Sequence, residues 1–158
     1  MSTLNMIGLN QEKTNELTHK MNILLASLQV YYQNLRGFHW NIKGRDFFEL
    51  HIKFEELYTV AQERIDEVAE RILTLGYTPN HNYGDYRKTS KIKESAQISD
   101  GIVAVGDILT AFQTIIILER ELLTLSADAE DEGTNALMSD YIRLQEKLVW
   151  MYSSFLNK

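Results

Sequence analysis

One stretch of the chain, between residues 39 and 70, carries histidines and carboxylates at spacings that could bind a metal ion. His51 and Glu55 are four residues apart, and so are Asp66 and Glu70. On a helix, residues four apart lie on the same face, one turn from each other. An imidazole beside carboxylate oxygens suits iron or manganese better than zinc, and His39 could add a third group. The ordinary alternative is a set of charges on a helix surface.

A long helix over residues 47–75 is predicted to carry these groups. The segment contains neither Pro nor Gly, and its apolar residues recur at helical spacing. They are Phe47, Leu50, Phe54, Leu57, Ala61, Ile65, Val68, Ile72 and Leu75. Asp46 is expected to cap the start of the helix, and Gly76 to end it.

The length of this helix limits how its two pairs can be used together. Glu55 and Asp66 are eleven residues apart, which corresponds to roughly 16 Å along the axis. Because metal–ligand bonds are ~2 Å long, one ion cannot contact both pairs on one straight helix. Either the pairs form separate half-sites, or a second copy packs antiparallel across a two-fold axis. The second arrangement makes two identical sites, each with one pair from each chain.

The composition excludes several classes of protein. The 158 residues, 44 % of them hydrophobic, suffice for a single domain over residues 1–158 with residues 1–9 as a flexible tail. The absence of Cys excludes disulfides, thiolate metal sites and a Cys nucleophile. The start lacks a signal-peptide core and no membrane span is predicted, so we expect a cytoplasmic protein. The net charge of −6 opposes strong binding to nucleic-acid phosphates.

Three more helices are predicted, over residues 10–38, 101–127 and 134–156. Their inward residues are Leu17, Met21, Leu24, Leu28, Tyr31 and Leu35 in the first, and Leu137, Tyr141, Leu144, Leu148, Met151 and Phe155 in the last. Gly37 and Gly44 are expected to bracket a turn with His39 and Trp40. The connection over residues 77–98 is long and is expected to contain a short helix over residues 89–95. Short, long and short connections predict an all-α, ferritin-like four-helix bundle with a crossover between its second and third helices.

Four sequence segments carry a close resemblance to a known family. HWNIKGRDFF, LHIKFEELY, IDEVAERILTLGYTP and KLVWMYSSFL resemble the Dps family, the small ferritin-like proteins of starved bacterial cells, over nearly the whole chain. The resemblance implies a ferroxidase site between subunits, with His39, His51 and Glu55 from one chain and Asp66 and Glu70 from its two-fold partner. The family usually has Asp where this chain has Glu55, so here the carboxylate reaches one methylene further.

The resemblance also implies what the protein does. We expect it to oxidise Fe²⁺, with hydrogen peroxide as oxidant, and to mineralise Fe³⁺ inside a hollow homododecamer, as protection against oxidative stress. Trp40 would lie near the iron, where it could intercept one-electron oxidants, or would pack as an interface or core aromatic. An acidic iron-entry pore is expected near the start of the last helix. Its candidates are Asp128, Asp131, Glu132 and Asp140, whose ordinary alternative is a favourable interaction with the helix dipole.

Two other interpretations remain at this point. The first is a DNA-binding, nucleoid-condensing protein; with only Lys13 before Lys20, the N-terminal segment would neutralise few phosphates, so weak or no DNA binding is expected. The second is an inert helical scaffold. The remaining histidines do not change this choice. Glu16 and His19 form a lone E-x-x-H pair, whereas a bundle-core di-iron site needs two, and His81 is expected on a surface loop.

Overall fold

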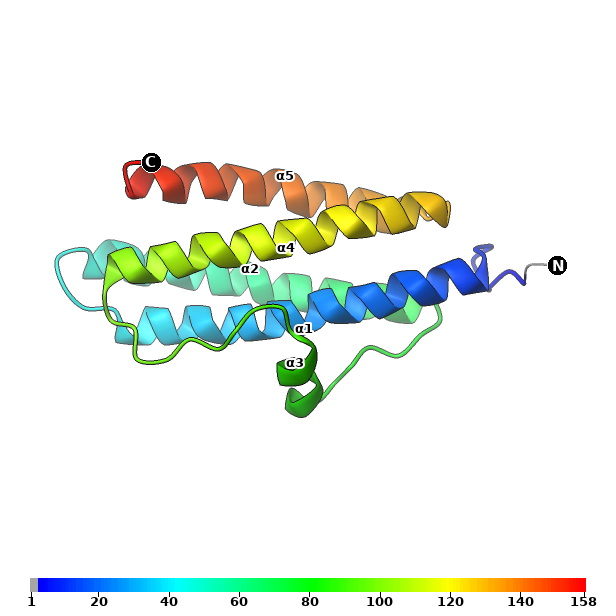
Figure 1. Ribbon diagram of the computed structural model, residues 1–158, viewed down its shortest axis with the longest axis horizontal. Helices are drawn as coiled ribbons and strands as arrows, with labels where there is room; N and C mark the ends of the chain where they lie inside the picture. The colour runs from blue at the N-terminus through cyan, green and yellow to red at the C-terminus, as the bar shows by residue number, and fades with distance from the viewer. Residues whose placement is uncertain (1–2) are drawn as a thin grey trace.

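The fold consists of four long helices and one short helix, within residues 3–158 that the computed structural model describes. The helices are α1 (Gln11–Asn41), α2 (Phe47–Thr74), α3 (Tyr83–Thr89), α4 (Gly101–Asp128) and α5 (Glu132–Phe155). α1 and α2 form one antiparallel pair and α4 and α5 the other, while α2 and α4 run in the same direction (Figure 1). The connection between α2 and α4 therefore travels along the bundle, which confirms the predicted ferritin-like topology.

The core follows the apolar stripes of α1 and α2. All six apolar residues predicted to face inward from α1 are buried, and so are Leu50, Phe54 and Leu57 of α2. Phe112 of α4 packs among them, with its ring 5.8 Å from that of Tyr31. Because burying one such side chain contributes about 1.5–3 kcal/mol, the seam between these helices supplies a large share of the stability.

The inward face of α5 differs from the predicted one. Leu144 and Met151 are 49 % and 45 % exposed, and Trp150 is 66 % exposed. Thr134 and Gln145 are buried instead. Hydrophobic spacing does not reveal this face because part of what α5 buries is polar.

The end of α1 is longer than predicted. The helix continues through Gly37 to Asn41, and Ile42 N–H still donates to the Phe38 carbonyl at 3.0 Å. His39 and Trp40 therefore lie on the last turn of a helix and not in a turn between helices. The actual turn follows them and is made possible by Gly44, whose φ of +106° favours glycine.

The ends of α2 are nearly as predicted. Asp46 precedes the helix, but its side chain makes no capping hydrogen bond. At the other end Gly76 has a φ of +94°, and Tyr77 N–H donates to the Ile72 carbonyl at 3.1 Å. This is the hydrogen bond of a Schellman motif, in which glycine ends the helix.

The crossover is attached to α1 by polar side chains. Asn22 accepts a hydrogen bond from Asn80 N–H at 2.8 Å, Ser27 from Lys91 N–H at 2.9 Å, and Asn34 from Ser95 N–H at 2.9 Å. The prediction of a short helix within the crossover is confirmed, but its bounds of 89–95 are wrong, because α3 spans Tyr83–Thr89. Ser95 N–H, which a helix over residues 89–95 would direct to the Lys91 carbonyl, is bound instead by Asn34 of α1.

The segment before α1 turns back on itself. Asn5 N–H donates to the Leu9 carbonyl at 2.8 Å, and Gln11 N–H to the Thr3 carbonyl at 3.0 Å. Residues 3–9 of the expected flexible tail are thus joined by hydrogen bonds, and Met1 and Ser2 lie outside the described residues.

α4 is the most apolar helix. Among the described residues it is the one helix that is long and apolar enough to cross a membrane, judged by length and composition alone. The core helix of a bundle meets the same criterion, and α4 packs against both α1 and α5. Its composition is therefore weak support for a membrane span.

Candidate metal centre

The end of α1 and the start of α2 bring two histidines together. The rings of His39 and His51 are stacked, with centroids 3.8 Å apart and planes 10° apart. His39 Nδ1 donates to the His51 carbonyl at 2.6 Å, and His51 Nδ1 donates to the His39 carbonyl at 2.7 Å. Because a carbonyl oxygen can only accept, each Nδ1 carries a proton, so the ring atom that can bind a metal is Nε2 in both residues.

Aromatic side chains hold this histidine pair in place. Phe47 stacks on His51 with ring centroids 4.8 Å apart, and Tyr58 meets His39 edge-on at 5.3 Å. His39 is only 8 % exposed as a result. Partial burial and the nearby Glu55 carboxylate raise the pKa of Tyr58, so its hydroxyl is neutral and can donate toward that carboxylate.

The second group of predicted ligands lies elsewhere on the protomer. α2 is one unbroken helix, so Asp66 stays about three turns and Glu70 about four turns from Glu55 along its axis. All three carboxylates are exposed. Within residues 3–158, no three or more His, Asp or Glu side chains lie close enough together to hold a metal ion. One protomer thus brings the two histidines together but leaves the carboxylates apart.

Trp40 lies beside the histidine pair on the outer side of α1. It is 55 % exposed, and the Arg36 guanidinium lies over its ring at 4.7 Å. Arg36 also lies 5.4 Å from the ring of Tyr32, which meets Tyr58 edge-on at 6.0 Å. In the protomer Trp40 is therefore a surface residue and not a core aromatic.

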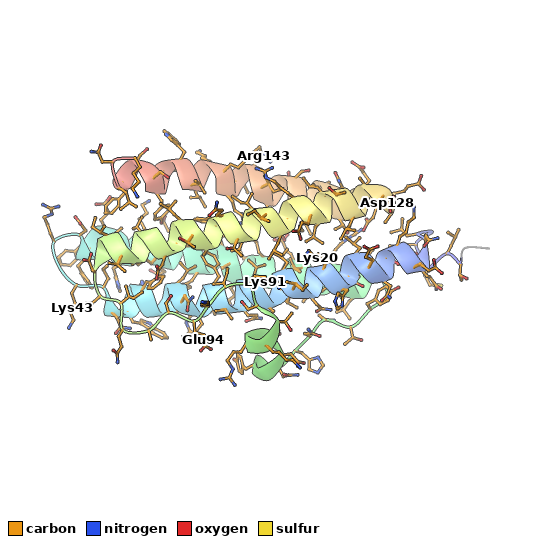
Figure 2. The ribbon with its side chains drawn as sticks, viewed as in Figure 1. Lys20, Lys43, Lys91, Glu94, Asp128 and Arg143 are labelled. Carbon is orange, nitrogen blue, oxygen red and sulfur yellow. The ribbon has the colours of Figure 1, made fainter. Side chains whose placement is uncertain are left out.

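The acidic residues near the start of α5 divide into two kinds. Asp128 is exposed at the end of α4 (Figure 2). Asp140, which pairs with Arg143 on α5 at 3.1 Å, is also exposed. Glu132 is exposed as well. Asp131 has a different role, because its side chain is only 2 % exposed and accepts from Arg71 of α2 at 2.7 Å.

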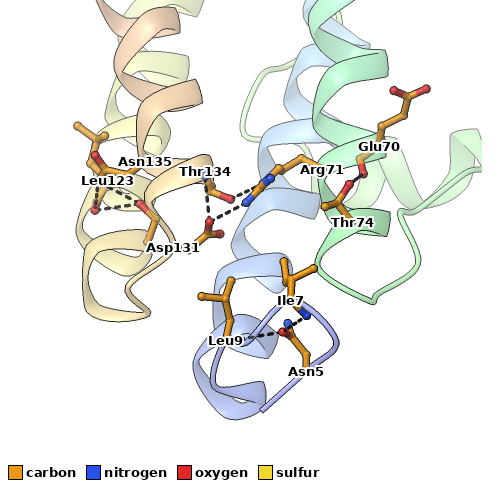
Figure 3. Close-up of polar contacts among 11 residues, drawn as sticks. Asn5, Ile7, Leu9, Glu70, Arg71, Thr74, Leu123, Asp131, Thr134 and Asn135 are labelled. Carbon is orange, nitrogen blue, oxygen red and sulfur yellow. Dashed lines mark hydrogen bonds and ion pairs between the residues drawn. The ribbon is translucent and has the colours of Figure 1, made fainter.

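The contacts of Asp131 join α2 to the start of α5 (Figure 3). The same Oδ1 atom accepts from Thr134 N–H at 3.0 Å, which caps α5, and Arg71 Nε donates to Thr134 Oγ1 at 2.9 Å. A carboxylate bound in this way holds two helices together.

Replacing Asp131 by Ala is expected to lower the free energy of unfolding by about 3 kcal/mol. The change removes the cap of α5 and leaves the Arg71 guanidinium without its carboxylate. Urea unfolding followed by circular dichroism measures the loss. The exposed Asp128→Ala is the control and should change stability by no more than about 0.5 kcal/mol. Equal losses in the two variants would contradict this role.

Known proteins share both the fold and the sequence. Residues 18–158 match the family model of the ferritin-like domain. A relative from Porphyromonas gingivalis, named DNA protection during starvation protein, is 40 % identical over 155 residues, which are 98 % of each chain. The chain belongs to the Dps family. The family resemblance of the four sequence segments is confirmed.

Solved structures agree with this membership of the Dps family. A Dps protein from Vibrio cholerae O1, described as a member of a broad superfamily of ferritin-like diiron-carboxylate proteins, has a TM-score of 0.96 and is 49 % identical, covering 99 % of this chain and 98 % of that one. A Dps protein from Bacillus brevis has a TM-score of 0.89 and is 32 % identical, covering 92 % and 97 %.

The sequence analysis does not predict that Tyr58 and Phe47 hold the two histidines of the candidate centre in place. Tyr58 follows His51 by seven residues, two helical turns, so helical spacing already places it on the same face. Phe47 is predicted only as part of the core stripe. In this Dps-family chain both residues position the imidazoles, and only the three-dimensional meeting of α1 with α2 shows it.

Proposed function

We propose that the protein is a ferroxidase that oxidises Fe²⁺ at sites shared between two subunits and stores the Fe³⁺ as a mineral. The observation that supports this most strongly is the reciprocal hydrogen bonding of His39 and His51. It leaves the Nε2 atoms of the two stacked imidazoles available as ligands at one place on the protomer. Two imidazoles with carboxylates form a donor set suited to iron.

The remaining ligands come from a second chain in this proposal. An antiparallel α2 across a two-fold axis would bring the partner copy's Asp66 and Glu70 to the histidine pair. α2 also exposes large apolar side chains on the protomer: Phe48 is 80 % exposed, Ile52 55 % and Leu73 57 %. Apolar groups gathered on one surface favour contact with another protein chain. We therefore place α2 at the subunit interface.

The chemistry follows from these ligands. Carboxylates neutralise the charge of bound Fe²⁺ and stabilise the more highly charged Fe³⁺ product. With hydrogen peroxide as oxidant, each of two Fe²⁺ ions gives one electron, the O–O bond breaks, and two protons complete two water molecules. No hydroxyl radical is released, because both electrons are delivered together. The extra methylene of Glu55 lets its carboxylate reach further from the axis of α2 than Asp would.

The oligomer in this proposal is a hollow, cytoplasmic dodecamer in which Fe³⁺ hydrolyses and mineralises. Asp128, Glu132 and Asp140 are exposed near the start of α5 and remain candidates for the lining of an acidic entry pore. A ring of such carboxylates would concentrate cations by its field. Asp131 is left out of the pore because Arg71 already binds it.

Simultaneous replacement of His51 and Glu55 by Ala is expected to slow Fe²⁺ oxidation at least about tenfold, since each ligand contributes strongly to metal affinity. Anaerobic Fe²⁺ mixed with peroxide in a stopped-flow spectrometer measures the rate. The control is Lys53→Ala with Glu56→Ala, an exposed pair on the same helix whose atoms lie 3.2 Å apart. Equal rates in wild type and the His51, Glu55 variant would refute the site.

Protection of DNA, which the name of the relative from Porphyromonas gingivalis mentions, would in this proposal be indirect. The chain carries a net charge of −6, so its average field repels a phosphate backbone. Removing Fe²⁺ and peroxide together protects DNA without contact. We therefore propose weak or no DNA binding for this member.

A further inference from the structure

A cluster of buried polar side chains lies inside the bundle, on the opposite side of α2 from Asp66. Arg64 of α2 is 7 % exposed, Glu119 of α4 is fully buried, and Tyr141 and Gln145 of α5 are 4 % and 1 % exposed. Arg64 and Asp66 are about 200° apart around the helix. The cluster is therefore separate from the proposed iron ligands.

Arg64 is the cation of this cluster. Its guanidinium lies over the Tyr141 ring at 4.9 Å, and within residues 3–158 no carboxylate forms an ion pair with it. Arg64 favours ionisation of the Glu119 carboxyl, but burial outweighs this and raises the pKa of Glu119 to about 8. Near neutral pH that carboxyl is mostly protonated, so it does not neutralise the guanidinium.

A cavity of about 200 Å³ opens beside Arg64. Gln145, Tyr31 and Tyr152 also line it, and the rest of the wall is mainly apolar, with Leu57 and Phe112 among the residues that line it. Lys53 and Glu56 also border it and are partly exposed, at 47 % and 59 %. The cavity therefore runs from the surface between α2 and α5 toward the buried cation.

The unpaired charge indicates the chemistry of a ligand. A guanidinium without a counter-ion attracts an anion, and its planar fork matches a carboxylate with two parallel hydrogen bonds. Apolar walls disfavour a fully hydrated ion such as phosphate. An apolar cavity of about 150 Å³ is large enough for benzene, so the space suits a small apolar acid.

We propose that this cavity binds a small apolar monocarboxylate, with the carboxylate on Arg64 and the hydrocarbon part between Leu57 and Phe112. The ligand supplies the missing negative charge and fills the apolar space. Binding adds a function beyond iron oxidation, because it uses none of the proposed iron ligands. It also links α2 to α5 from within the bundle, so it should stabilise the fold.

Benzoate is the probe for this site. In isothermal titration calorimetry of the assembled protein, benzoate should bind. Benzyl alcohol should bind at least about tenfold more weakly, because it lacks the charge. Inorganic phosphate should not compete with benzoate. Arg64→Met keeps the bulk of the side chain and should weaken benzoate binding at least about tenfold, while Arg64→Lys should restore part of the loss. Arg120→Met, at an exposed arginine paired with Glu146 at 2.8 Å, is the matched control and should bind as wild type.

Three results would overturn the proposal. They are no benzoate binding to wild type at millimolar concentration, equal affinity for benzoate and benzyl alcohol, and unchanged affinity in Arg64→Met. If Arg64→Met does not fold, two measurements on the wild-type protein test the proposal instead. They are the affinities for benzoate and benzyl alcohol, and the position of benzoate in a soaked crystal. Benzoate found only away from Arg64 in that crystal counts against the site.

Discussion

Mixing subunits that carry His51→Ala with subunits that carry Asp66→Ala and Glu70→Ala is expected to restore about a quarter of the wild-type rate of Fe²⁺ oxidation. Each variant alone is expected to be close to inactive. The gain follows from the two-fold interface. In random pairs, about half contain one subunit of each kind, and each mixed pair has one intact site and one site with both defects. The rate is measured after the variants are dissociated together and reassembled.

A second mixture provides the control for this recovery. His51→Ala and Glu55→Ala damage the same half of the site, so every site in their mixed pairs remains defective and no recovery is expected. If all ligands came from one chain, the first mixture would stay inactive as well. Recovery in the first mixture alone would therefore establish that a subunit owns only half of the centre. If every variant has the circular dichroism spectrum of the wild type, the loss of rate is not caused by a loss of fold.

The sequence is sufficient to predict the helix that carries the candidate ligands. The segment over residues 47–75 has one dominant apolar period, and a glycine ends it, so local and tertiary preferences agree. The same agreement holds for α1, whose apolar stripe is buried throughout. Fold class and crossover topology follow, because long stripes and one long connection leave few other ways to pack four helices.

The interactions between distant segments could not be predicted in the same way. The hydrogen bonds between His39 and His51 depend on α1 continuing past Gly37, a residue type that favours turns. Asp131 sits in an acidic run that suggests a pore, and only its contact with Arg71, sixty residues earlier, shows the ion pair. In each case a pair of groups far apart in the chain decides the role of a residue. Spacing along one helix carries no information on such pairs.

Glu119→Gln is expected to make the protein more stable at pH 8, by an amount on the order of 4 kcal/mol, and to leave its stability near pH 4.5 almost unchanged. Burial raises the pKa of Glu119 from its ordinary value of 4.5 to about 8, against the smaller opposing effects of Arg64, Gln145 and Arg120. The folded protein therefore binds a proton that the unfolded chain releases between these two values. The contribution of Glu119 to stability therefore falls by about 1.4 kcal/mol for each pH unit in this window.

The direction of this pH effect distinguishes burial from an ordinary ion pair. A carboxylate whose pKa is lowered by a cation would lose stability as the pH falls, whereas Glu119 loses it as the pH rises toward 8. The amide of Gln145 donates to Glu119 Oε2 at 3.2 Å, and the amide oxygen that the substitution introduces can accept that bond at every pH. Urea unfolding at several pH values between 4.5 and 9 measures the difference, with Glu121→Gln, at the exposed ion pair with Lys20, as the control. A stability difference that does not grow with pH would mean that Glu119 stays ionised in the core and that Arg64 already has its counter-ion.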